Sequence, residues 1–255
     1  MMPTVAVTRY VTPLREGGSL PGLVEADDLG TYVCKFRGAG QGLRVLVAEV
    51  VAAGIARTLD VPTPRLVVLD LDPAIARYEA DEEVQDLLTA SAGHNLGIDF
   101  LPGSFGFDGT VPGDDHGVGA RILWLDAFLA NVDRTWRNPN LLIWGERLWA
   151  IDHGASLYFH HGWAGGLGDP QRFANQPWDM TGHVFSDQAD ALPEIDAGFR
   201  AALTHEALAG IVEDVPEEWL AEVPGATTGQ QRTAYVDFLL ARLGSRSWLP
   251  VRGAA

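Results

Sequence analysis

The pattern of hydrophobic and polar positions predicts strands and one helix in the first third of the chain. Residues 23–36 (LVEADDLGTYVCKF) hold two short apolar-rich segments around an Asp-Asp-Leu-Gly turn, which is typical of a β-hairpin. Residues 43–59 then place apolar side chains at helical spacing, and the proline-bounded residues 61–72 indicate another strand. We therefore expect a strand-helix-strand unit that closes near residue 72.

The middle of the chain has a weaker pattern. Residues 76–88 (ARYEADEEVQDLL) predict a helix with a solvated acidic face, and residues 91–117 are rich in glycine and proline and predict a loop. Asp114, Asp115 and His116 in this loop are residue types that bind metals. Acids clustered among glycines are more often a hydrated loop, and we favour that interpretation.

A second hairpin is predicted after a helix over residues 118–131. Residues 141–144 (LLIW) and 147–151 (RLWAI) have strand character and flank Gly145-Glu146, a plausible two-residue turn. If Trp144 faces Arg147, then Asn138 faces His153, and Asn138 meets Asp152 at the open end of the hairpin.

Helical patterns dominate the C-terminal part of the chain. They cover residues 202–212, then residues 214–223 with Asp214 as the expected N-cap and Pro216 in the first turn, and then residues 231–243. The tryptophans there are expected in the core or at its rim, and nothing in this region identifies a substrate.

Charge and composition exclude several classes of protein. The 255 residues carry a formal net charge of -16, which repels phosphate backbones, so we expect no nucleic-acid partner. No run approaches the roughly 18 apolar residues that a membrane-spanning helix needs, and the N-terminus does not resemble an export signal. The single cysteine, Cys34, rules out internal disulfides and multi-cysteine zinc sites. A cytoplasmic location is the resulting expectation.

The lysine content draws attention to one position. Lysine and arginine together number 18, and Lys35 is the only lysine among them. Strand alternation places Lys35 on the face opposite Tyr32, Cys34 and Phe36. Chance could leave one lysine, but a compact ammonium does chemistry that a planar guanidinium does not, so we favour a functional role.

Two further features upstream could serve a phosphate-binding site. Glu49 is the only acid between Leu43 and Leu59, and a carboxylate buried in such an apolar helix needs a partner, for which Lys35 is the candidate. The alternative is that Glu49 faces solvent beside an arginine, either Arg44 or Arg57. Gly17, Gly18 and Ser19 form a turn whose backbone amides could approach a phosphate, although such a turn is often only a turn.

Acids and amides gather around the second hairpin. An amide oxygen from Asn138 beside the Asp152 carboxylate suits Mg²⁺, a hard cation that binds through one or two carboxylates and substrate phosphates. Asp133, five residues before Asn138, could accept a proton from an attacking hydroxyl or orient it. Arg134 or Arg137 could supply positive charge there, or either could be a surface arginine.

These segments resemble one known family. Residues 32–42 (YVCKFRGAGQG), the helix with Glu49, residues 125–140 (LDAFLANVDRTWRNPN) and residues 148–154 (LWAIDHG) are similar to the HipA-like kinases, in particular their short actinobacterial-type members. The DRTWRN and AIDHG pieces are also similar to motifs of phosphoinositide kinases. The likeness is specific over about residues 15–162, because several motifs occur in order, and it is vague from Trp163 onward.

The resemblance implies an α+β, two-lobed protein-kinase-like fold that binds ATP and Mg²⁺. A small β-rich lobe would span residues 1–90, and a mainly helical lobe would span residues 91–255. The implied roles by residue are catalytic for Asp133, phosphate-holding for Lys35 paired with Glu49, ATP-binding for Gly17, Gly18 and Ser19, and metal-binding for Asn138 and Asp152. Two departures stand out: Thr135 replaces a histidine that is common in the family, and His153 replaces the phenylalanine after the metal-binding aspartate.

Three functions are compatible with these residues and with the resemblance. The favoured one is an ATP- and Mg²⁺-dependent kinase with an unidentified hydroxyl acceptor, of which protein serine or threonine is one candidate. A nucleotide-binding pseudokinase that acts as an interaction module is the alternative, and an unrelated metal hydrolase explains Lys35 and Glu49 poorly. His153, His160 and His161 suggest zinc, but we favour a loop beside the site, since adjacent histidines usually diverge.

Overall fold

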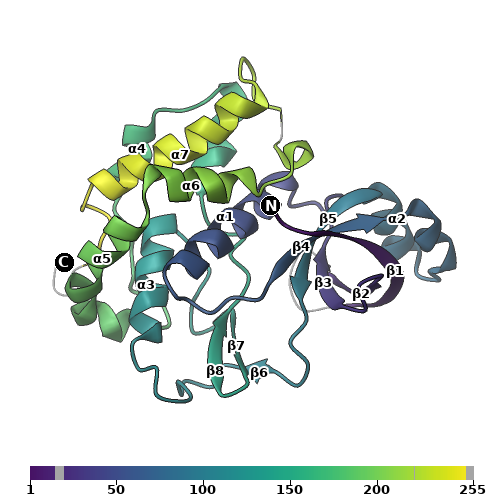
Figure 1. Ribbon diagram of the computed structural model, residues 1–255, viewed down its shortest axis with the longest axis horizontal. Helices are drawn as coiled ribbons and strands as arrows, with labels where there is room; N and C mark the ends of the chain where they lie inside the picture. The colour runs from purple at the N-terminus through teal and green to yellow at the C-terminus, as the bar shows by residue number, and fades with distance from the viewer. Residues whose placement is uncertain (15–19, 221, 251–255) are drawn as a thin grey trace. The chain divides into compact units, whose positions relative to one another are not determined.

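The structure is a computed structural model that describes residues 1–14, 20–220 and 222–250 (Figure 1). The chain forms two compact units, one of residues 1–46 and 64–102 and the other of residues 47–63 and 103–255. The expected division at residue 90 differs from this one at two places. The first unit continues to residue 102, and residues 47–63 belong to the second.

A closed five-stranded barrel forms the first unit. Its strands are β1 (Thr4–Pro13), β2 (Gly22–Ala26), β3 (Thr31–Lys35), β4 (Leu66–Leu71) and β5 (Gly93–Asp99), in the order β1-β2-β3-β5-β4. Strands β1 and β4 pair in parallel and close the barrel, while the other neighbours are antiparallel. The hairpin expected over residues 23–36 is β2 with β3, and that prediction is confirmed.

Alternation along β3 sorts its side chains as the sequence predicted. Tyr32, Cys34 and Phe36 are buried in the core of this unit, whereas Val33 and Lys35 point to the other face of the strand. Burial raises the pKa of the Cys34 thiol, so this cysteine is an inert core residue. Lys35 lies at the end of β3, opposite Leu96 of β5, and is 9% exposed.

The predicted loop over residues 91–117 is wrong in its first part, because β5 occupies Gly93–Asp99 and pairs on both sides. Glycine disfavours strand formation, so the glycines at positions 93 and 97 led to the prediction of a loop here. A Cβ at Gly97 would lie 2.6 Å from Val67 Cγ2 and 2.7 Å from Leu69 Cγ. Close packing against β4 therefore requires glycine at a position where strand propensity disfavours it.

We expect Gly97→Ala to lower the free energy of unfolding by about 1–3 kcal/mol, because the new methyl group overpacks the barrel. Urea unfolding followed by circular dichroism measures the change. Gly40→Ala is the control, since a Cβ there meets nothing within 4 Å, and its effect should stay within about 0.5 kcal/mol. Equal stability of the two variants would contradict the packing argument.

The acidic segment of the first unit is broken into two short elements. A 3₁₀ helix, η1 (Pro73–Tyr78), precedes helix α2 (Glu82–Ala90), so the helix expected from residue 76 begins later than predicted. Asp81 caps α2, because its Oδ1 accepts from the backbone N–H groups of Glu83 and Val84.

Helices make up most of the second unit, and Figure 1 shows α3 to α7 gathered beside a small sheet. Helix α1 (Leu43–Thr58) contributes its residues from Val47 onward. The other helices are α3 (Val118–Leu129), α4 (Pro170–Ala174), α5 (Leu192–Ala202), α6 (His205–Glu213) and α7 (Thr228–Gly244), with 3₁₀ helices η2 (Tyr158–Gly165), η3 (Ser186–Ala191) and η4 (Glu217–Trp219). The sheet has the order β6 (Phe105–Gly106), β7 (Leu141–Trp144) and β8 (Arg147–Ala150).

One predicted helix of the C-terminal part does not form. Among the described residues 214–220 and 222–223, the only helical element is the short η4, and Asp214 is the C-cap of α6 instead of an N-cap. Arg232 of α7 donates to the carbonyls of Val212 and Val215 at 2.5 and 2.7 Å, which satisfies backbone groups where α6 ends. These two hydrogen bonds from α7 hold the end of α6 at the place where the sequence pattern predicted the start of a new helix.

Helix length also bears on membrane insertion. In the described part of the chain, no helix combines the length and the apolar character needed to cross a bilayer.

Candidate functional site

The hairpin that organises the site has the predicted register. Trp144 pairs with Arg147 and Leu141 with Ala150, and the Ile151 N–H donates to the Asn140 carbonyl at 3.0 Å. The two turn residues, at positions 145 and 146, have φ of 56° and 57°, the left-handed values that a tight turn of this twist requires. The hairpin therefore fixes which backbone groups lie at its open end.

Asp133 is held at this end by three asparagines. Its Oδ2 accepts from the Nδ2 of Asn138 at 2.9 Å and from the Nδ2 of Asn140 at 3.2 Å. Its backbone N–H donates to Asn131 Oδ1 at 3.1 Å. The structure thus brings Asp133 and Asn138 together, and it adds Asn131 and Asn140, which were not among the predicted site residues.

Behind Asp133 lies a buried ion pair. Arg134 Nε donates to Asp126 Oδ2 at 2.5 Å, and both side chains are fully buried. Asp126 also accepts from Asn131 Nδ2 at 2.9 Å and contacts His183 Nε2 at 3.0 Å. Burial alone would raise the pKa of the Asp126 carboxyl, but the charge of Arg134 and the hydrogen bond with His183 hold that pKa below its usual range.

The same arginine fastens the hairpin. Its guanidinium donates to the carbonyl oxygens of Asn140 at 2.5 Å and Ile151 at 3.2 Å, and its Nη2 lies 3.2 Å from His153 Nδ1. Arg134 is 1% exposed, so the interpretation as a surface arginine is wrong, while a role as a source of positive charge for a ligand stays a prediction. Arg137 is exposed.

The sequence contains a signal for this ion pair. Asp126 is the only acid in the apolar helix α3, which is the same pattern that drew attention to Glu49 in α1. A carboxylate in such a helix needs a cation or several hydrogen-bond donors, and Arg134 is eight residues away.

Glu49 is buried, at 2% exposure, so the solvent-facing alternative is wrong. Its Oε2 accepts from the backbone N–H of His153 at 3.1 Å. The neighbouring Asp152 has φ of 52°, a left-handed conformation that is uncommon for a residue other than glycine and that this anchor helps to hold. The α1 helix thereby positions the segment that carries Asp152.

The other predicted site residues are Lys35 and the turn of residues 17–19. Lys35 belongs to the first unit, and its pairing with Glu49 stays a prediction. Gly17, Gly18 and Ser19 lie outside the described residues. Thr135 Oγ1 accepts from the Asn138 backbone N–H at 3.3 Å, so this residue shapes the loop between the predicted catalytic and metal-binding positions.

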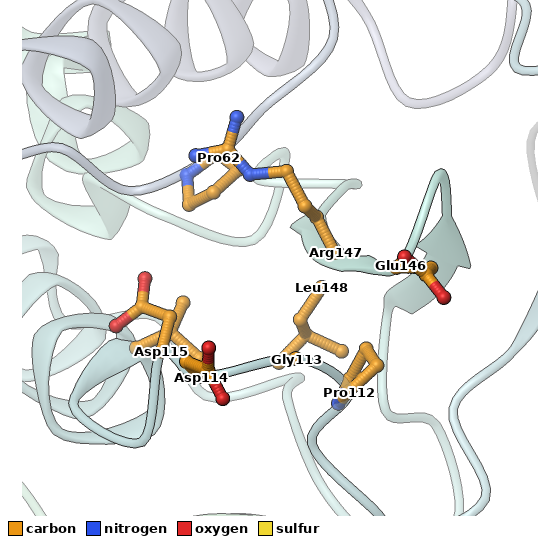
Figure 2. A pocket seen from close by; sticks show the side chains of 9 residues that line it. Pro62, Pro112, Gly113, Asp114, Asp115, Glu146, Arg147 and Leu148 are labelled. Atoms are coloured by element: carbon orange, nitrogen blue, oxygen red, sulfur yellow. The ribbon is translucent and has the colours of Figure 1, made fainter.

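An acidic pocket of about 160 Å³ lies near β8, and Figure 2 shows Asp114, Asp115, Glu146 and Arg147 at its walls. Asp115 is paired with Arg121, whose guanidinium lowers the pKa of that carboxyl. Within the part of the chain that the structure describes, no three histidine, cysteine or acidic side chains are grouped so as to hold a metal ion.

Comparison with known proteins identifies the family. The family model described as HipA-like kinase matches residues 7–248. The chain belongs to the HipA-like kinase family. The match reaches well beyond residue 162, where the resemblance visible in the motifs ends, so the helical C-terminal part of this HipA-like kinase also follows the family.

One solved kinase structure supports the fold. The chain is similar to the Helicobacter pylori proinflammatory kinase CtkA, with a TM-score of 0.59 and 10% identity over 96% of this chain and 95% of that one. A second similar structure is that of a Golgi casein kinase, with a TM-score of 0.49 and 11% identity over 99% of this chain and 74% of that one. No curated protein matches the chain. The α+β, protein-kinase-like fold expected from the motifs is confirmed.

Proposed function

We propose that this HipA-like kinase transfers the γ-phosphoryl group of ATP to a hydroxyl, with Mg²⁺ bound at Asn138 and Asp152. The observation that carries the proposal is the Asp133 carboxylate, which two amide groups hold beside the hairpin that leads into Asp152. Kinase catalysis depends mainly on positioning and electrostatics, and fixed polar side chains of this kind suit it.

Asp133 is the group proposed to act on the acceptor. Hydrogen bonds from Asn138 and Asn140 both reach Oδ2, which leaves Oδ1 as the oxygen that can accept the proton of an incoming hydroxyl. The Asn131 contact to the backbone of Asp133 fixes the loop in position. The acceptor class is a hydroxyl compound, and serine or threonine of a protein is the form we propose.

The oxygen donors at the end of the hairpin fit Mg²⁺. Asn138 donates its Nδ2 to Asp133, so its Oδ1 is the atom available to a cation, and the Asp152 carboxylate is the second protein donor. When bound, Mg²⁺ neutralises charge on the nucleotide phosphates. The chain's own part is to hold Asp152 in place, through the bond from the His153 N–H to Glu49.

Lys35 is proposed to hold the phosphates of ATP and to pair with Glu49. Its ammonium is compact, and no other lysine exists in the chain to replace it. The match of the family model over residues 7–248, which include Lys35, supports this assignment.

A nucleotide-binding assay and a transfer assay together test the function. Purified protein with Mg²⁺ and ATP at 100 times Kd should gain about 2.7 kcal/mol of stability in thermal unfolding. Incubation with γ-labelled ATP and casein or cell extract should then move label to protein. Stabilisation without any transfer would favour the pseudokinase alternative, and the absence of both would overturn the proposal.

Glu49→Gln separates the two roles of this residue. Glutamine keeps an oxygen that can accept from the His153 N–H, but it lacks the charge that would pair with Lys35. We therefore expect stability to change by less than about 1 kcal/mol while the KM for ATP rises or kcat falls about tenfold or more.

Glu49→Ala is the matched comparison and should also destabilise the protein, by about 1–3 kcal/mol, because the His153 N–H loses its acceptor. Full activity of Glu49→Gln would show that the backbone contact alone matters and would remove the proposed pairing with Lys35.

A further inference from the structure

An aromatic pocket of about 260 Å³ opens in the second unit, separate from the residues assigned to phosphoryl transfer. Its walls include the rings of Tyr158, Phe159, Trp163, Phe173 and Phe238. These rings pack on one another, with Phe159 and Phe238 stacked at 4.4 Å between centroids. These packed rings fix the shape of the cavity, which is therefore a defined pocket and not a shallow surface depression.

One buried donor in this wall has no acceptor. Trp163 is 1% exposed, and its indole Nε1 makes no hydrogen bond within the described part of the chain. The indoles of Trp124 and Trp248, by contrast, donate to Asp196 Oδ1 at 2.9 Å and to the Arg242 carbonyl at 2.6 Å. A buried N–H without an acceptor destabilises the structure around it, so the pocket favours an occupant that supplies an acceptor.

Gly168 lies beside this donor at the wall of the pocket. A Cβ built there would lie 3.8 Å from Trp163 Nε1 and 3.6 Å from Phe238 Cζ, so any side chain at this position would fill the space beside the indole. Gly168 and Trp163 both line the pocket, so an occupant whose acceptor lies beside Gly168 would place that acceptor next to the indole.

The polar groups at the walls also favour an oxygen acceptor. Arg172 is a second donor, since its guanidinium carries N–H groups and no acceptor. Asp169, the acid among the lining residues, accepts from the Gln171 N–H through Oδ1 as the cap of α4. Tyr158 donates to Gln176, so that hydroxyl is engaged as well.

We propose that this pocket binds a small planar aromatic molecule that carries a carbonyl or carboxylate oxygen, with the ring between the aromatic walls and the oxygen on Trp163 Nε1. The volume suits this class, because a cavity of about 150 Å³ already holds benzene and the remainder accommodates one polar substituent. The proposal does not depend on phosphoryl transfer, and neither of its key residues belongs to that site.

Nuclear magnetic resonance of the indole groups tests the proposal directly. The full chain, labelled with ¹⁵N-tryptophan, has eight indole N–H groups. The signal that is missing in the Trp163→Phe variant belongs to Trp163. Titration with benzamide or benzoate should shift the Trp163 indole proton downfield in a saturable way. Toluene, which has the ring without the acceptor, should not produce the downfield shift. The comparison of benzamide with benzoate separates a neutral carbonyl from a carboxylate ligand.

Gly168→Ala is the decisive variant and should weaken benzamide binding about tenfold, the equivalent of about 1.4 kcal/mol. Gly165→Ala is its matched control, because a Cβ there meets nothing within 4 Å, and it should bind as the wild type does. An indole proton that neither probe moves would mean that water alone satisfies the donor and would overturn the proposal. Equal affinity of the two alanine variants would also overturn it, whether or not Trp163→Phe folds.

Discussion

Asp133→Asn is expected to lower the rate of phosphoryl transfer by about 10²–10⁴-fold, the usual contribution of a general base. Asparagine has nearly the same shape as aspartate and can still accept a hydrogen bond from Asn138 or Asn140, so the loop should keep its conformation. Its amide cannot accept the proton of the hydroxyl. The expected loss is therefore in kcat, while stabilisation by Mg²⁺ and ATP should persist.

Transfer of label from γ-labelled ATP in a single turnover measures this loss, and thermal unfolding with nucleotide measures binding. Asp114→Asn is the matched control, since it removes one carboxylate from the exposed loop of the same unit and should leave the rate unchanged. A fully active Asp133→Asn variant would remove Asp133 from the mechanism. Loss of nucleotide binding together with activity would instead assign it to the binding site.

Arg134→Met is expected to lower the free energy of unfolding by about 3–5 kcal/mol, the largest stability effect we predict. The substitution leaves the Asp126 carboxylate buried without its cation and frees the carbonyls of Asn140 and Ile151. Urea unfolding measures the change. Arg121→Met is the control, because its partner Asp115 is 46% exposed and such a pair contributes at most about 1 kcal/mol. Equal effects of the two variants would contradict a special role for the buried pair.

Acid titration provides an independent test of the same ion pair. The pKa of Asp126 in the folded protein lies below its ordinary value, so ionised Asp126 stabilises the fold at pH values above about 4, the ordinary value for an aspartate. This contribution is lost as the pH falls toward the folded pKa. The stability difference between wild type and Asp126→Asn should therefore shrink below about pH 4, and a difference that is constant with pH would contradict the assignment.

Local sequence predicted the elements whose patterns are complete within a short segment. The hairpins β2-β3 and β7-β8 depend on burial of every second residue and on the residues of their turns. Tyr32 and Cys34 share one face of β3, and Trp144 pairs with Arg147 across the turn of the second hairpin. Helices α1, α3 and α7 follow from apolar spacing. The likeness to the HipA-like kinases rested on the order of Lys35, Glu49, Asp133, Asn138 and Asp152, which is also a property of the sequence.

Only the tertiary structure decided where buried polar groups find their partners. Strand β5 forms because two neighbouring strands satisfy its backbone, although its glycines weaken the local signal. Arg134 is buried because it pairs with Asp126, and Glu49 accepts a hydrogen bond from the His153 N–H. Both contacts follow from the rule that a buried charge or donor must have a partner. The sequence by itself determined which residues could do chemistry. The partners of these residues come from distant segments of the chain. Tertiary packing decides which partners they have, because it leaves as few buried polar groups as possible without a hydrogen bond.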